Sequence, residues 1–151
     1  QMEHAERVLA ARGLSGLFDA VYGVEHADFL PKPDRAAFDK VFATDGLNPA
    51  SAAMFEDDPR NLAVPHAIGM RTVHVAADPV EAPHIHHHTD DLAAVLVCIN
   101  ARNTIVHGNF HQALANFNIN RVLIAIFFYK SDFTHLIVLL GLVCELFSKM
   151  I

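Results

Sequence analysis

Short apolar segments alternate with amphipathic segments along the first half of the chain. The segment 18–24 is short and rich in β-branched and aromatic residues, and 52–56 and 71–76 are also predicted to be strands. The segments 32–47 and 61–69 are predicted to be helices, each ended by a glycine. Strands that alternate with helices of this length form βαβ units, whose strands lie parallel in one sheet. The sequence therefore predicts an α/β fold with a parallel, Rossmann-like sheet and flanking helices.

Capping residues mark several helix ends. A helix predicted over 3–12 ends at a glycine, and the helix over 32–47 opens with Pro33 and Asp34 and ends at another glycine. One more helix is expected over 90–96, where Thr89 or Asp90 can act as its N-cap.

The composition changes near Leu96. All seven prolines lie in residues 1–96, whereas 97–151 contain no proline and only two acidic residues, Asp132 and Glu145. We therefore divide the chain into a first domain, 1–96, and an apolar extension, 97–151.

The extension contains two apolar runs, 121–129 and 136–144. Each is too short to span a bilayer, which needs about 20 apolar residues. A pair of buried strands or helices is the favoured interpretation, ahead of a membrane helix. The remaining alternative is a segment from a fused or shifted reading frame.

Charge and cysteine content exclude several classes of protein. The net charge of −6 argues against nucleic acid or an anionic membrane as a partner. Cys98 and Cys144 lie far apart and lack metal-ligand spacing, so no disulfide framework is indicated. Residues 1–13 are charged and amphipathic, without the apolar core of a signal peptide, which predicts a cytoplasmic protein.

Three consecutive acidic residues, Glu56, Asp57 and Asp58, stand at the end of an apolar strand. In an open α/β sheet, ligands bind beyond the carboxyl ends of the strands. Lys32 follows the preceding strand through a short loop, so an ammonium group and the Asp57 and Asp58 carboxylates are expected at one rim. Carboxylate oxygens suit Mg²⁺ and lysine suits phosphate oxygens. The alternative is a solvated acidic turn.

Three stretches in this order carry a family resemblance: "LPKPDRAAFDKVF", "MFEDDPRNL" and "GMRTVHV". They resemble the last two motifs of haloacid dehalogenase (HAD) superfamily phosphatases. They are most similar to the bacterial pyrimidine 5′-nucleotidase group, and the similarity extends over residues 3–96. The resemblance implies that 1–96 form the C-terminal portion of such a core, and therefore an incomplete Rossmann-like sheet.

The resemblance also implies roles for individual residues. Lys32 resembles the lysine that balances charge between the nucleophile and the transferred phosphoryl group. Asp57 resembles the first acid that binds magnesium, and Asp58 resembles the second. Asn61 stands where many relatives carry a further acid. The implied reaction converts a nucleoside 5′-monophosphate to a nucleoside and phosphate through an aspartyl-phosphate.

The nucleophile of that family is absent from the expected place. Residues 1–96 contain no D-x-D-x-T motif, and "FFYKSDFTH" (127–135) imitates it with Lys130 at the nucleophile position. Lysine cannot form an aspartyl-phosphate, so we expect a fragment of a phosphatase without activity. The alternative is a non-catalytic interaction module that self-associates through its apolar tail or an open sheet edge.

Two further expectations concern the sheet and the histidines. In the family, the nucleophile strand lies beside the strand equivalent to 52–56. We therefore expect the run 122–129, or a second molecule, to pair with that open edge. His84 and His86–His88 form either a metal cluster or a loop, and the loop is favoured because they precede a helix cap.

Overall fold

The computed structural model describes residues 2–11, 13–16, 18–92, 94, 121–126 and 136–140. The helices are α1 (Met2–Ala11), η1 (Val24–Ala27), α2 (Arg35–Asp45), η2 (Pro49–Ser51), η3 (Pro59–Leu62) and α3 (Ala63–Ala67), where η denotes a 3-10 helix. The strands are β1 (Ala20–Tyr22), β2 (Ala52–Glu56), β3 (Arg71–Val75), β4 (His87–Thr89), β5 (Arg121–Ile126) and β6 (Leu136–Leu140). No helix within the described ranges is long and apolar enough to cross a membrane.

Two predicted strands and one predicted helix of the first half of the chain are confirmed. The strands expected at 52–56 and 71–76 are β2 and β3, and the helix expected over 32–47 is α2. Asp34 is its N-cap and accepts a hydrogen bond from the backbone N–H of Ala36 at 2.9 Å. Gly46 ends α2 with φ of 72°, a conformation that glycine adopts without steric cost.

The segment predicted as one helix over 61–69 divides into η3 and the short α3. Pro59 opens η3, and Pro65 lies inside α3. Proline has no N–H to donate to the carbonyl four residues earlier, so a regular α-helix cannot begin at 61 with its full set of bonds.

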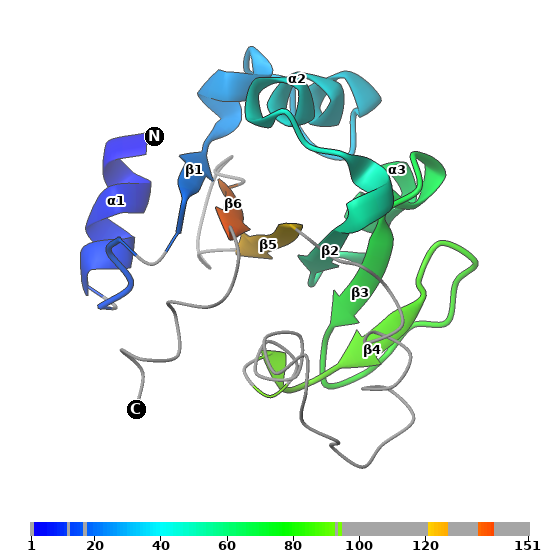
Figure 1. The fold of residues 1–151 in the computed structure, drawn as a ribbon. Helices are drawn as coiled ribbons and strands as arrows, with labels where there is room; N and C mark the ends of the chain where they lie inside the picture. Colours follow the sequence, from blue (N-terminus) through cyan, green and yellow to red (C-terminus); the bar gives the residue numbers. More distant parts are fainter. Residues whose placement is uncertain are drawn as a thin grey trace.

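All six strands lie in one sheet, in the order β1-β6-β5-β2-β3-β4 (Figure 1). β2 runs parallel to β3 and to β5, and β3 runs parallel to β4. β6 is antiparallel to both β5 and β1. The sheet is therefore mixed, with a parallel part, β5-β2-β3-β4, that includes the α/β elements predicted from the sequence.

The expectation that the run 122–129 would pair with the strand 52–56 is confirmed by β5 for the described part of the run, and residues 127–129 lie outside the described residues. Phe55 of β2 lies opposite Ile124 of β5, and the ladder extends back to Ala52 opposite Arg121. The second apolar run of the extension provides β6, so the described part of each run is a strand, as one of the interpretations predicted. The composition boundary near Leu96, and residues 93, 95 and 96 of the helix predicted over 90–96, lie outside the described residues.

One prediction about the histidines is wrong. His87 and His88 belong to strand β4, not to a loop. His88 lies opposite His74 of β3 in a parallel ladder, and Thr89 lies opposite Val75. Pairing with the outer side of β3 therefore overrides the polar, loop-like composition of this segment.

The main described core lies between α2 and β2. Phe38, Val41 and Phe42 of α2 are buried with Ala52 and Met54 of β2. Successive side chains of a strand point to opposite faces, so Glu56 continues the face that carries these two β2 residues. This packing fixes the end of β2 beside the loop that precedes α2.

Candidate functional site

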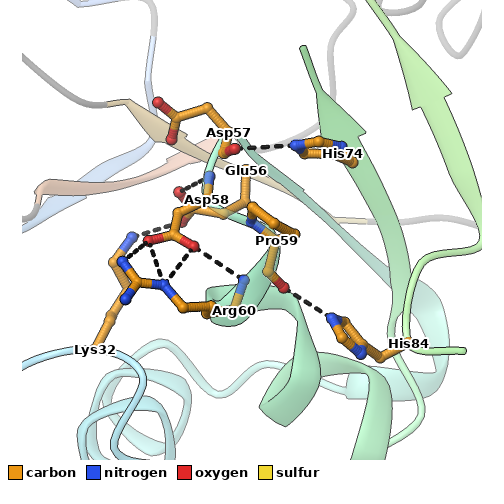
Figure 2. Close-up of polar contacts among 8 residues, drawn as sticks. All are labelled: Lys32, Glu56, Asp57, Asp58, Pro59, Arg60, His74 and His84. Carbon is orange, nitrogen blue, oxygen red and sulfur yellow. Dashed lines mark hydrogen bonds and ion pairs between the residues drawn. The ribbon is translucent and has the colours of Figure 1, made fainter. Parts of the chain in front are cut away.

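The carboxyl end of β2 brings together residues from three parts of the chain. Glu56 ends the strand, and Asp57 and Asp58 form the turn that leads into η3. Lys32 reaches the same place from the loop between η1 and α2 (Figure 2). The expected meeting of a lysine with acidic residues at this rim of the sheet is therefore present in the structure.

Lys32 pairs directly with Glu56, a residue that the sequence analysis assigned no role. The ammonium Nζ of Lys32 lies 2.6 Å from Oε2 of Glu56. Their side chains are 3% and 0% exposed, so the pair is removed from solvent. The other carboxylate oxygen of Glu56, Oε1, accepts the backbone N–H of Asp58 at 3.2 Å. Both oxygens of the buried carboxylate are thus hydrogen-bonded.

Burial raises the pKa of Glu56 from 4.5 to about 7. The Lys32 ammonium opposes this rise, whereas the neighbouring Asp57 carboxyl group adds to it. The pKa of Glu56 therefore lies near neutral pH, and a cation nearby would favour its charged form.

The Asp58 carboxylate is held by Arg60. Asp58 caps η3 by accepting the backbone N–H of Arg60 at 3.0 Å. The Arg60 guanidinium also approaches the carboxylate, with Nη2 2.6 Å from Oδ2. Hydrogen bonding from this side chain lowers the pKa of Asp58, so its carboxylate remains charged. Its oxygens already have donors, which makes it a weaker metal ligand than Asp57.

Asp57 is exposed, and its main chain is anchored by β3. The carbonyl oxygen of Asp57 lies 3.0 Å from Nε2 of His74 (Figure 2). The backbone is held while the side chain remains accessible, which is the arrangement expected of a residue that binds a ligand from solvent.

Sequence reasoning missed Glu56, Arg60 and the two histidines that reach the turn, His74 and His84. A signal for Glu56 was present, because it is the only charged residue in the otherwise apolar segment 52–56. A charged residue in a buried strand requires a partner. No comparable signal marked the histidines, since their acceptors are backbone carbonyls.

The donor set fits magnesium in part. Mg²⁺ uses one or two carboxylates and completes its octahedral shell with water and phosphate oxygens. Asp57 supplies an accessible carboxylate, whereas the carboxylate of Asp58 is bound by Arg60. Within the described ranges, no group of three or more His, Cys, Asp or Glu residues is arranged to hold a metal ion. The residues present therefore supply fewer ligands than a complete protein cage.

A comparison with known protein families gives a match over the segment that contains this site. Residues 1–75 match the sequence profile of the haloacid dehalogenase-like hydrolases. This segment is haloacid dehalogenase-like. The match includes Lys32, the acidic turn and all of β3, and hydrolases of this superfamily generally use Mg²⁺. No curated protein and no solved structure gives a significant match to the chain.

Proposed function

We propose that residues 1–75 carry the charge-balancing and metal-binding half of a phosphomonoester hydrolase site. The observation that supports this most strongly is the buried Lys32–Glu56 pair beside the acidic turn, at the rim of the sheet where α/β proteins bind ligands.

Each residue has a distinct role in this proposal. Lys32, oriented by Glu56, neutralises phosphoryl oxygens as charge develops on them. Asp57 holds magnesium, and Asp58 assists it. When bound, Mg²⁺ supplies Lewis-acid stabilisation of the phosphoryl group. Phosphoryl transfer depends mainly on such positioning and charge stabilisation.

The proposed substrate class is a small phosphate ester, specifically a nucleoside 5′-monophosphate. This finer assignment rests on the similarity of the three quoted stretches to the pyrimidine 5′-nucleotidase group. It is a proposal about the reaction to which this half site belongs.

The 151-residue chain itself is proposed to be inactive. β5 pairs with β2 on the side where the family places its nucleophile strand, and its sequence, RVLIAI, contains no carboxylate. We expect no turnover of p-nitrophenyl phosphate above the blank. Turnover that is abolished by Asp57→Ala would show that the chain has a complete site.

Metal binding tests the half site directly. We expect calorimetry to show Mg²⁺ binding weaker than micromolar, because the acidic turn provides only part of an octahedral shell. Asp57→Asn should abolish this binding, Asp58→Asn should reduce it less, and Asp78→Asn, at an exposed position outside the turn, should leave it unchanged. Equal loss in the Asp57 and Asp78 variants would contradict the assignment.

The alternative, self-association through the tail, is not favoured by the strand pairing. β5 lies between β2 and β6, and β6 lies between β5 and β1, so both edges of each strand are paired within the chain. The outermost described strands, β1 and β4, have only three residues each.

A further inference from the structure

Two histidines from other parts of the chain are hydrogen-bonded to backbone carbonyls at the acidic turn. Nε2 of His74, on β3, lies 3.0 Å from the carbonyl oxygen of Asp57. Nε2 of His84, which precedes β4, lies 2.9 Å from the carbonyl oxygen of Pro59. Figure 2 shows the two contacts on either side of Asp58. The backbone is thus held immediately before and immediately after that residue.

The direction of these hydrogen bonds follows from the acceptors. A carbonyl oxygen can only accept, so Nε2 of each imidazole carries the proton and donates it. His74 is 2% exposed, and a buried donor of this kind loses more when its partner is removed than an exposed one does.

The position of each histidine is itself supported by neighbouring residues. His74 lies in β3, which pairs with β2 along the strand that leads into the turn. The backbone carbonyl of His84 accepts the hydroxyl of Thr72, also on β3, at 2.7 Å. Both imidazoles are therefore carried by the β3–β4 side of the sheet, and they connect that side to the end of β2.

We propose that His74 and His84 are positioning residues for the acidic turn, which they hold in the conformation that presents Asp57 to a cation. The inference rests on the proposed function of that turn. The two contacts fix the backbone on both sides of Asp58, and Asp57 lies directly before it. Nε2 of each histidine donates to a carbonyl group, so this nitrogen is not a metal ligand in this arrangement.

Paired substitutions separate this role from simple packing. His74→Phe and His84→Phe keep a ring but remove the donor, whereas His74→Gln and His84→Gln keep an N–H at a similar reach. His66→Phe is the matched control, since His66 stacks near His86 with ring centroids 4.9 Å apart and belongs to α3. Urea unfolding of all five variants reports their global stability.

Two readouts are measured on the full chain. The first is amide hydrogen exchange at Asp58, Arg60 and Asn61, whose N–H groups bond within the turn. The second is binding of Mn²⁺, a paramagnetic substitute for Mg²⁺, followed by electron paramagnetic resonance. We expect both Phe variants to exchange faster at these amides and to bind Mn²⁺ about tenfold more weakly, as for other residues that orient metal ligands. The Gln variants and His66→Phe should stay close to the wild type.

Three results would contradict the role proposed for His74 and His84. Unchanged exchange in both Phe variants overturns the inference, and so does an equal loss in the Gln and Phe variants. Faster exchange throughout the chain, shared by His66→Phe, also overturns it, because the effect would then be global. If the wild type binds no Mn²⁺ but the turn amides respond as expected, the proposed metal function fails while the positioning of the turn stands.

Discussion

Glu56 places a carboxylate at the end of a strand whose other residues are apolar and buried. The desolvation of such a group is costly, and a buried ion pair seldom repays it in full. The presence of the Lys32–Glu56 pair therefore does not by itself indicate a large gain in the free energy of unfolding. The function proposed above gives a separate reason for an ammonium group at this rim of the sheet.

Removal of the ammonium should reveal how much Glu56 depends on it. Lys32→Met leaves the carboxyl group buried without a cation, and we expect the free energy of unfolding to fall by about 3 kcal/mol at pH 8. The loss should be smaller at pH 6. Because the pKa of Glu56 is raised in the folded protein from 4.5 to about 7, the folded state binds this proton more tightly, and stability falls as pH rises through that range.

Urea unfolding at the two pH values measures this effect. Lys40→Met is the control, because Lys40 pairs with Asp28 at the surface and such pairs contribute at most about 1 kcal/mol. The double variant Lys32→Met/Glu56→Gln should recover part of the loss, since no buried charge remains. Equal losses at both lysines would show that the buried pair has no special role.

His86 makes stability depend on pH at a second place. Its Nδ1 accepts the backbone N–H of Thr72 at 3.2 Å, and burial, followed by the charge of Arg71, lowers its pKa from 6.5. The unfolded chain therefore takes up this proton more readily, so stability should decline as pH falls below 6.5. His86→Asn keeps an acceptor, Oδ1, that does not titrate.

Thermal melting at pH 7.5 and pH 5.5 compares the two proteins. We expect the melting temperature of His86→Asn to fall less than that of the wild type between these values. His4→Asn, at an exposed position on α1, serves as the control. The same pH dependence in all three proteins would contradict the prediction.

At the scale of elements, β5 is the central connection of the sheet. It joins β2 by parallel pairing and β6 by antiparallel pairing. Every backbone N–H of an interior strand faces one of its two neighbours, so an unpaired group there costs free energy. β5 thus holds the family-like part of the sheet and the remaining strands together.

Proline in β5 should break this connection. Leu123→Pro removes a backbone donor in the middle of the strand, and we expect a loss of about 3 kcal/mol or complete unfolding. Leu123→Val keeps the N–H group and a high strand propensity, and serves as the control. Circular dichroism with urea titration distinguishes them, and equal stability of the two variants would mean that β5 does not pair as described.

At the scale of the molecule, the sheet forms only when strands from the two halves of the chain pair with one another. β1 is attached through β6 alone, and β2 has β5 as its neighbour on one side. Within residues 1–96, β1 and one edge of β2 therefore depend on β6 and β5 for their strand pairing. Such pairing between distant segments is slow to form, because the intervening chain must be closed into a loop first.

A chain of residues 1–96 tests this dependence. Without β5 and β6 it leaves β2 with an unpaired apolar edge, and we expect aggregation with loss of cooperative melting. Size-exclusion chromatography and circular dichroism on the shortened and full-length chains provide the measurement. A monodisperse 1–96 fragment that melts like the full chain would show that the extension is dispensable.

The elements encoded by local patterns could be predicted from the sequence. β2, β3 and α2 follow from apolar periodicity, a capping Asp34 and a terminal glycine, all of which act within a few residues. The placement of Lys32 and Asp57 at one rim also follows, because the loops after two strands that point the same way lie at the same edge of the sheet. The sequence did not show that β5 and β6 lie between β1 and β2.

Other features were decided only by the tertiary structure. The Lys32–Glu56 pair joins residues 24 positions apart, and the antiparallel direction of β6 is not encoded in its composition. His74 and His84 reach backbone carbonyls, which every residue possesses and no sequence pattern marks. Local patterns specify what a segment prefers to be, whereas its partner depends on which groups remain unpaired when the whole sheet assembles.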